Sequence, residues 1–299
     1  MSDALAPGLG GLAPPAGSLD GLGYRGKVCV VSAAASGMGE QVAVILHELG
    51  AVVHTVDIAE PVVARASHTA MDQGSPASVS AALETLRAIG PVDYLFPCIG
   101  VPPHTVGAVG CMAINWIGHR HFVEGLIPQL RDGGAIATIS SVAGRNWREN
   151  LAERQQLLAL ADSAEARAWC EANPDKLRNS YGVSKEMINV WALALAPELG
   201  KRGIRIVVTA PCPVDTAFMA SQFTVSGREM FDAYPYPLLG RMATAREQAW
   251  SLVLLASPLN AAVTGAILAT DQGYEGGIAT GQIEDYTATL ARQAAARNA

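Results

Sequence analysis

Residues 28–57 read VCVVSAAASGMGEQVAVILHELGAVVHTVD, and this stretch decides the fold. It opens with the run 28–31, which is short, apolar and β-branched, as in a strand buried on both faces. A turn with Gly37 and Gly39 follows, then a helical pattern, then a second apolar run that ends on Asp57. Strand, glycine turn, helix, strand and acidic residue occur in that order in dinucleotide-binding βαβ units.

The same alternation continues along the chain. Further strands are predicted at 92–96, 135–140, 204–209 and 266–269, and further helices over 76–89, 112–130, 181–199 and 244–256. Apolar strands that alternate with helices predict a parallel sheet covered on both faces. We therefore expect an α/β protein with a doubly wound parallel sheet, a Rossmann fold.

We expect one catalytic domain over residues 27–280, because no break in composition divides this stretch. Residues 1–26 are rich in Gly, Pro and Ala and are predicted to form a flexible tail. Residues 281–299 are predicted to form a C-terminal helix or tail.

Composition limits the classes of function. The chain has 299 residues, 50% of them hydrophobic, and a formal net charge of −6, which argues against nucleic acid as a partner. No apolar run approaches the roughly 18 residues that cross a bilayer, and no secretory signal is visible, so we expect a cytoplasmic protein. The five cysteines are scattered with no C-x-x-C pair, which predicts free interior thiols and no metal site.

The glycine turn predicts the cofactor. Its residues Ser36, Gly37, Met38 and Gly39 would let the backbone approach a pyrophosphate closely. Asp57 at the end of the next strand can accept both ribose hydroxyls and would repel a 2′-phosphate. No Arg or Lys follows until residue 65, so NAD is favoured over NADP.

A second pattern predicts the chemistry. Tyr181 and Lys185 are four residues apart and share one face of a predicted helix. A neighbouring ammonium group lowers the pKa of a phenol, which can then exchange a proton with an alcohol or ketone. Ser141 follows a predicted parallel strand, where such sheets place ligands; Ser140 is its rival for the same role.

Together these features resemble the short-chain dehydrogenase/reductase family over residues 25–275. Further motifs of that family are matched by 113–116, 210–216, 239–242 and 264–274. The resemblance implies that Tyr181 is the general acid/base, that Ser141 holds the substrate oxygen, and that Lys185 binds the nicotinamide ribose and lowers the Tyr181 pKa. It implies that Asn115 anchors a water in a proton relay.

The resemblance also implies the cofactor contacts. Beyond the glycine turn and Asp57, these are Asp72, Cys98, Ile99, Gly100, Tyr181, Lys185, Pro211, Val214 and Thr216. Three positions depart from the family pattern: Ala33 replaces the first glycine of the turn, Cys98-Ile99-Gly100 replaces Asn-Ala-Gly, and Cys212 follows Pro211 in place of a glycine. These changes put cofactor affinity in doubt more than activity.

The link from Ser141 to Tyr181 is longer than is usual in the family, with an insertion at about 147–178. Apolar Leu157, Leu160, Ala161, Ala164 and Ala168 predict one amphipathic helix that ends near residues 173–174. The insertion either packs on the body or a partner subunit, or forms a wall of the pocket.

This insertion resembles a branch that contains bacterial 3α-hydroxysteroid dehydrogenase/carbonyl reductase and coniferyl-alcohol dehydrogenase. The branch implies a bulky, largely apolar alcohol or ketone as the substrate. The predicted pocket residues are Val142, Trp147, Cys212, Phe218 and Met219, with Tyr234 as a further candidate. It also implies a homodimer, with a homotetramer as the alternative.

Two other functions compete with an NAD-dependent alcohol dehydrogenase or ketone reductase. A sugar-nucleotide epimerase or dehydratase is disfavoured, because those enzymes need a larger region after the sheet than residues 275–299 supply. An NAD-binding redox sensor without turnover is disfavoured, because it has no need for Ser141, Tyr181 and Lys185 together.

Overall fold

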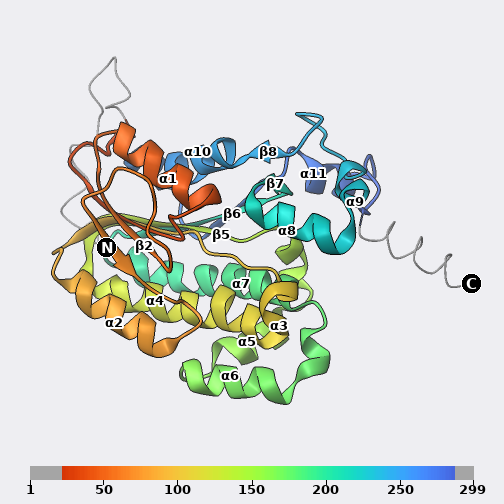
Figure 1. The fold of residues 1–299 in the computed structure, drawn as a ribbon, viewed down its shortest axis with the longest axis horizontal. Coiled ribbons are helices and arrows are strands. Elements are labelled where there is room, and N and C mark those ends of the chain that lie inside the picture. Colours follow the sequence, from red (N-terminus) through yellow and green to blue (C-terminus); the bar gives the residue numbers. More distant parts are fainter. Residues whose placement is uncertain (1–21, 287–299) are drawn as a thin grey trace, which may run out of the picture.

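A parallel sheet of seven strands forms the centre of the computed structural model, which describes residues 22–286 (Figure 1). Its strands, from one edge to the other, are β3 (Ser67–Ala70), β2 (Val52–Asp57), β1 (Val28–Ser32), β4 (Val92–Pro97), β5 (Leu130–Ile139), β6 (Arg205–Pro211) and β9 (Ala266–Thr270). The short strands β7 (Val214–Asp215) and β8 (Ala243–Thr244) form a separate pair. The predicted Rossmann fold is confirmed.

Strand β1 is the switch point of the sheet. It pairs in parallel with β2 on one side and with β4 on the other, so the chain winds outward in both directions from here. Every residue of β4 and β6 is buried, which explains why their sequences are largely apolar and do not alternate between apolar and polar residues. In such sheets the crevice for a ligand lies at the carboxyl ends of the strands beside the switch point.

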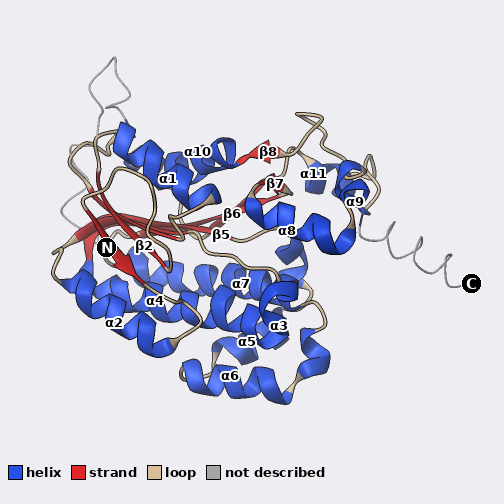
Figure 2. Cartoon of the chain, in the orientation of Figure 1, coloured by secondary structure: helices blue, strands red, loops and turns tan. Residues whose placement is uncertain are grey.

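Helices cover both faces of the sheet (Figure 2). One face carries α1 (Gly37–Glu48) and α10 (Ala245–Ala256), and the other carries α2 (Pro76–Arg87), α4 (His119–Leu126) and α7 (Ser180–Gly200). The remaining helices are α3 (Pro103–Met112), α5 (Leu151–Leu158), α6 (Ser163–Ala172), α8 (Ala217–Ser226), α9 (Arg228–Asp232) and α11 (Tyr274–Ala279). Among the helices in residues 22–286, none is long and apolar enough to cross a membrane.

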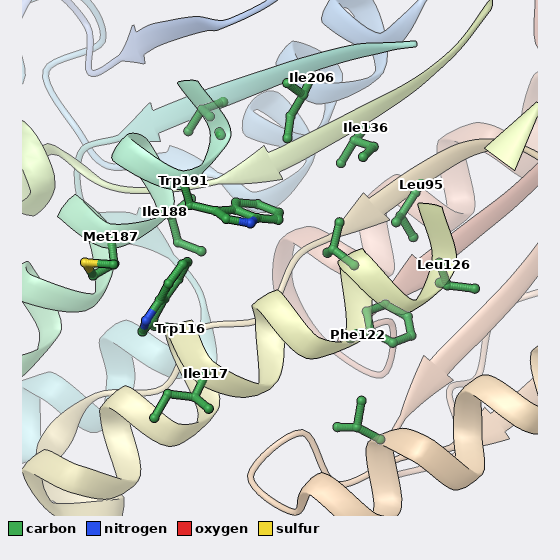
Figure 3. Close-up of a cluster of buried hydrophobic side chains, with 14 of the residues drawn as sticks. Leu95, Trp116, Ile117, Phe122, Leu126, Ile136, Met187, Ile188, Trp191 and Ile206 are labelled. Carbon is green, nitrogen blue, oxygen red and sulfur yellow. The ribbon is translucent and has the colours of Figure 1, made fainter. Parts of the chain in front are cut away.

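A large apolar cluster joins the sheet to α4 and α7 (Figure 3). Leu95, Ile136 and Ile206 contribute from three neighbouring strands. The rings of Trp116 and Trp191 meet edge to face with their centroids 6.2 Å apart, an arrangement that aromatic pairs favour. This cluster fixes α7, the helix that carries Tyr181 and Lys185.

The helix predicted over 112–130 is wrong in extent. The segment contains the end of α3, a π-helical turn over Ala113–Gly118, α4, and a 3-10 turn over Ile127–Gln129. Gln73 donates a side-chain hydrogen bond of 3.0 Å to the carbonyl of Ile114 in the π-helical turn. Pro128 has no N–H to donate, and the helix gives way to β5, which begins at Leu130 rather than at 135.

The insertion forms two helices, α5 and α6, so the prediction of a single helix is wrong. Asp162 begins the second helix, because its Oδ1 accepts hydrogen bonds from the N–H groups of Ala164 and Glu165 at 2.8 and 2.9 Å. The break changes the phase of the second helix. Leu157 is buried as expected, but the three predicted alanines (161, 164 and 168) are exposed, and Ala166 and Cys170 are buried instead.

The tail predicted over 1–26 is too long at its C-terminal end. Tyr24 is buried, its hydroxyl donates a 2.6 Å hydrogen bond to the carbonyl of Val253, and its ring packs on Tyr94 and Phe96. Residues 1–21 and 287–299 lie outside the described residues. The predicted domain limits of 27 and 280 otherwise stay predictions.

The turn between β1 and α1 is tightly constrained. A Cβ on Gly39 would lie 2.2 Å from the carbonyl oxygen of Ala33, so only glycine fits there. Ala33 itself has φ of +53°, a left-handed conformation that costs an L-residue roughly 1–2 kcal/mol. The residue that departs from the family's glycine therefore occupies a position suited to glycine.

We expect Ala33→Gly to stabilise the protein, because glycine adopts this conformation without the steric cost. After the entropy that glycine adds to the unfolded chain, the gain should be about 1 kcal/mol, or about 2–4 °C in Tm. Calorimetry of Ala33→Gly beside Ala34→Gly checks this. Ala34 is buried and its φ is not positive, so its replacement should lower Tm. A fall in Tm for both variants would contradict the prediction.

Candidate active site

A cavity of about 350 Å³ lies at the carboxyl ends of β1, β4, β5 and β6. The loops after these strands supply much of its lining, namely residues 33 and 36–39, 98–100, 139–143 and 145, and 211–214 and 216–219. Tyr181 and Lys185 of α7 complete this part of the wall. The volume is within the range of small-molecule sites.

The glycine turn forms one end of the cavity. All of the predicted cofactor residues line it except Asp57 and Asp72. Asp57 is tied to the turn, because the N–H of Ala35 donates to its Oδ2 at 2.9 Å. Asp72 lies elsewhere, after β3, and its Oδ1 accepts from the N–H of Gly74 at 2.8 Å. A turn that admits no Cβ at Gly39, beside a carboxylate at the end of β2, fits a dinucleotide.

Arg65, the first cationic residue after Asp57 in the sequence, already has hydrogen-bond and ion-pair partners. Arg65 Nη1 donates to the carbonyls of Pro61 and Val63 at 2.8 and 2.9 Å, and Nη2 pairs with Glu60. For Arg65 to bind a 2′-phosphate, these contacts, including the ion pair with Glu60, would have to be broken.

Three side chains meet where α7 faces the end of β5. The Nζ of Lys185 donates to the carbonyl of Ile139 at 3.1 Å and lies 5.6 Å from the centroid of the Tyr181 ring. The Oγ of Ser141 accepts from the N–H of Ala143 at 3.1 Å, which fixes the serine at the cavity wall. Ser141 is also close enough to Tyr181 for its hydroxyl to lower the pKa of the phenol.

The two serines differ in their surroundings. Ser140 is buried, and its hydroxyl donates a 3.0 Å hydrogen bond to the carbonyl of Lys185. Ser141 is half-buried beside Tyr181. Ser140 therefore ties β5 to α7, and Ser141 is the serine with a free approach to a ligand.

Burial dominates the electrostatics of the site. Loss of solvent lowers the pKa of Lys185 to about 8, because burial disfavours the charged ammonium. Loss of solvent also raises the pKa of Tyr181 to about 12, and the nearby hydroxyl of Ser141 only partly opposes this. The expected lowering of the Tyr181 pKa is therefore wrong for the site as it stands, because desolvation of the phenolate is the largest influence on this pKa.

Asn115 lies in the π-helical turn, a type of irregularity that often occurs at functional sites. Its Oδ1 accepts from the N–H of Val101 at 2.8 Å, and its Nδ2 donates to the carbonyl of Val101 at 2.9 Å and to Ser184 Oγ at 3.3 Å. The amide thus holds the loop after β4 in place. It does not line the cavity.

The substrate end of the cavity includes most of the predicted pocket residues. Val142, Cys212, Phe218, Met219 and Tyr234 line it. Trp147 does not: its ring carries the guanidinium of Arg148 at 4.3 Å from the centroid. The 3-10 turn over Val142–Arg148 directs residue 145, rather than 147, into the wall.

Sequence reasoning missed the far wall of the cavity. The residues it missed are Arg145, Gln222, Met230, Phe231, Tyr274 and Tyr286. They are separated from the motifs by long stretches of chain and carry no fixed spacing. The only available signal was the concentration of aromatic residues over 218–236.

The insertion does not form a wall of the cavity. Among the described lining residues, none comes from 146–180. The insertion packs instead on α7, through a buried ion pair between Arg154 Nε and Glu186 Oε2 at 2.7 Å. The Nδ2 of Asn150 donates to both oxygens of Glu186 at 3.0 and 3.1 Å. The pocket-wall interpretation is thus wrong and the insertion packs on the body, whereas packing on a partner subunit stays a prediction.

Comparison with known proteins identifies the family. The short chain dehydrogenase model matches residues 27–153, and the related model described as enoyl-(acyl carrier protein) reductase matches residues 167–275. The chain belongs to the short-chain dehydrogenase/reductase family, whose members are oxidoreductases that bind a nicotinamide cofactor.

Particular relatives lie in the branch expected from the insertion. The chain is 27% identical to coniferyl-alcohol dehydrogenase from Pseudomonas sp., over 83% of this chain and 96% of the relative. It is also 27% identical to 3-alpha-hydroxysteroid dehydrogenase/carbonyl reductase from Comamonas testosteroni, with the same two coverages. Among solved structures, 3-alpha-hydroxysteroid dehydrogenase from Pseudomonas sp. B-0831, complexed with NADH, aligns with a TM-score of 0.72. That structure is 22% identical and is matched over 86% of this chain and all of its own, which establishes the shared fold.

The ion pair between the insertion and α7 should contribute strongly to stability. Both side chains are only 6% exposed, so Arg154→Leu would leave the Glu186 carboxylate buried without its cation. We expect the free energy of unfolding to fall by about 3–5 kcal/mol, measured by urea denaturation.

A matched control is available in α6. Arg167 pairs with Glu171 at 3.1 Å, but the two side chains are 50% and 56% exposed, so Arg167→Leu should change stability by less than about 1 kcal/mol. The double variant Arg154→Leu/Glu186→Leu should recover much of the loss. Equal effects of Arg154→Leu and Arg167→Leu would contradict the prediction.

Proposed function

We propose that this protein transfers hydride between NAD(H) and a bulky, largely apolar alcohol or ketone, with Tyr181 as the general acid/base. One observation carries the proposal: Ser141, Tyr181 and Lys185 line a single cavity between the glycine turn and an aromatic wall. A bound nicotinamide would accept or donate the hydride. The protein's own groups must then orient the substrate and move one proton.

Each of the three side chains has a distinct part in the proposal. In alcohol oxidation the phenolate of Tyr181 takes the hydroxyl proton while the carbinol carbon loses its hydride. Ser141 holds the substrate oxygen by a hydrogen bond, a part for which its half-exposed position beside Tyr181 is suited. The ammonium of Lys185 favours the phenolate and would bind the ribose. Reduction of a ketone follows the same path in reverse.

The amide of Asn115 supports this arrangement from behind. Its hydrogen bonds to Val101 hold the loop that brings Gly100 against Lys185, where a Cβ on residue 100 would lie 3.4 Å from Nζ. The relay of protons from Lys185 through a water at Asn115 stays a prediction.

Support for a bulky apolar substrate comes from the composition of the wall. Phe218, Met219, Met230 and Phe231 present large apolar surfaces to the cavity. The ring of Phe218 lies 5.5 Å from that of Tyr181, so the apolar surface reaches the proposed reaction centre. The two named relatives, a coniferyl-alcohol and a 3-alpha-hydroxysteroid dehydrogenase, agree with a ring-containing alcohol as the substrate.

Support for NAD over NADP comes from the end of β2. Asp57 is fixed beside the turn by the N–H groups of Ala35 and Ala59, at 2.9 and 3.1 Å. Glu60 adds a second carboxylate, and it pairs with Arg65. A 2′-phosphate would meet negative charge there. The homodimer and the cytoplasmic location expected from the sequence stay predictions, and light scattering of the purified protein tests the first.

The first experiment follows reduction of the cofactor by purified protein with NAD or NADP. The panel should contain 3α-hydroxysteroids, coniferyl and other aryl alcohols, and simple secondary alcohols. We expect turnover with NAD on a bulky alcohol, and Tyr181→Phe should abolish it while NAD binding persists. No turnover across the panel, with NAD still bound, would favour a redox sensor instead.

The pH dependence follows from the two pKa values. Below pH 12 most of Tyr181 is protonated, so the phenolate fraction rises by about tenfold per pH unit. Lys185 loses its charge above a pKa of about 8, which removes the ammonium that stabilises the phenolate. We expect kcat/KM for alcohol oxidation to rise from pH 6 to 8 and then to level. Ketone reduction needs the protonated phenol and should not rise. A flat oxidation profile from pH 6 to 8 would contradict Tyr181 as the base.

A further inference from the structure

Two tyrosine hydroxyl groups in the cavity wall have no hydrogen-bond partner within residues 22–286. They belong to Tyr234, which follows α9, and Tyr286, which follows α11 along the chain. Tyr234 is 7% exposed, and both hydroxyl oxygens are buried. A buried hydroxyl without a partner costs about 1–3 kcal/mol, so native proteins rarely retain one without a purpose.

The neighbouring tyrosines show that these two are exceptional. Tyr234, Tyr236, Tyr274 and Tyr286 form one aromatic cluster, in which the Tyr234 ring lies 5.0, 4.6 and 5.4 Å from the other three. Tyr236 donates to the carbonyl of Phe231 at 3.0 Å, and Tyr274 donates to Asp285 Oδ1 at 3.2 Å. Tyr236 and Tyr274 are therefore satisfied by the protein, whereas Tyr234 and Tyr286, which line the cavity together with Tyr274, are not.

An ion pair, hydrogen bonds and ring contacts hold Tyr234 and Tyr286 in place. Arg145, four residues after Ser141, forms an ion pair of 2.6 Å with Asp285. Tyr274 bonds to the same carboxylate, and its hydroxyl oxygen accepts the N–H of Tyr286 at 2.8 Å. Ring contacts on three sides hold Tyr234. The segment that carries Tyr286 is thereby joined to the loop that carries Ser141.

A ligand atom is the partner that the site still needs. Burial raises the pKa of Tyr234 well above its usual value, so its hydroxyl stays protonated and can both donate and accept. The adjoining wall is formed by apolar Phe218, Met219, Met230 and Phe231. A purely apolar ligand would leave both hydroxyls unpaired, whereas an oxygen on the ligand would pair with them.

We propose that the substrate is a largely apolar, ring-containing alcohol or ketone with a second hydrogen-bonding oxygen, and that Tyr234 and Tyr286 bind this second oxygen. The inference rests on the proposed function and deepens it. Ser141 and Tyr181 hold the reacting oxygen, and the tyrosine pair selects among apolar alcohols by the oxygen at the other position. Tyr234 and Tyr286 are thus specificity-determining residues.

The test compares two alcohols that differ by one oxygen, cinnamyl alcohol and 4-hydroxycinnamyl alcohol. Their dissociation constants are measured by calorimetry in the presence of NADH, with which an alcohol cannot react, so the measurement needs no turnover. One net hydrogen bond should make the hydroxylated alcohol bind about 3- to 10-fold more tightly to the unaltered protein. In Tyr234→Phe/Tyr286→Phe the ratio should fall to about one.

Tyr236→Phe is the matched control, because its hydroxyl is paired and it does not line the cavity. It should keep the preference for the hydroxylated alcohol. The single variants Tyr236→Phe and Tyr234→Phe should also differ in stability. Tyr236→Phe loses a hydrogen bond and should lower Tm, by about 2–4 °C for each kcal/mol lost. Tyr234→Phe removes an unpaired hydroxyl and should not lower Tm.

The outcomes separate this inference from the proposed function. Equal or absent binding of the two alcohols, or a preference that survives in Tyr234→Phe/Tyr286→Phe, overturns the inference even if NAD-dependent turnover is found. A preference that this double variant removes supports the inference even if no alcohol is oxidised, in which case the proposed function fails alone.

Discussion

Helix α7 meets the carboxyl end of β5 through a set of buried hydrogen bonds, and the site depends on this junction. Ser140 Oγ donates to the carbonyl of Lys185, the Nζ of Lys185 donates to the carbonyl of Ile139, and Asn189 Nδ2 donates to the carbonyl of Gly144. A Cβ on Gly144, in the 3-10 turn that follows β5, would lie 2.8 Å from the backbone of Lys185, so this turn and α7 touch without intervening side chains. Because the bonds cross in both directions, neither the strand end nor the helix can shift alone. This contact therefore fixes the distance between Ser141 and Tyr181.

Lys185 and Glu186 are adjacent buried charged residues of α7, and they differ in how their charges are stabilised. Glu186 has its countercharge in Arg154 and further hydrogen bonds from Asn150, as a buried carboxylate requires. Lys185 is left with a backbone carbonyl, and burial lowers its pKa to about 8. The paired glutamate stabilises the helix. The pKa of the lysine is thereby brought close to neutral pH, and shifts of this kind are frequent at functional sites. The insertion thus packs on α7 at the residue next to Lys185.

The sequence predicted those parts of the molecule in which one local pattern determines the outcome. The buried strands and the helix over 181–199 are continuous apolar or strongly periodic runs, and tertiary packing agrees with them. Strand β3 was missed because Ser67-His68-Thr69-Ala70 has no apolar run, and parallel pairing with β2 forms it. The prediction that Trp147 lines the pocket was wrong, because the 3-10 turn directs residue 145 rather than residue 147 into the cavity wall. The prediction of a lowered Tyr181 pKa was wrong because a sequence shows the spacing of Tyr181 and Lys185, whereas the desolvation that raises the pKa depends on the completed fold.

The unpredicted residues are concentrated at the substrate end, and this division has a physical basis. The glycine turn, Ser141, Tyr181 and Lys185 lie on or beside core strands and α7, where backbone geometry admits few alternatives. The far wall comes from α8, α9 and the chain after α11, which are joined mainly by ring contacts among tyrosines and by the Arg145–Asp285 pair. Ring contacts tolerate changes of residue type better than a turn that excludes a Cβ. In the proposed function the catalytic groups can therefore stay constant while the far wall changes, and we expect the residues that select the substrate to lie in that wall rather than in the motifs.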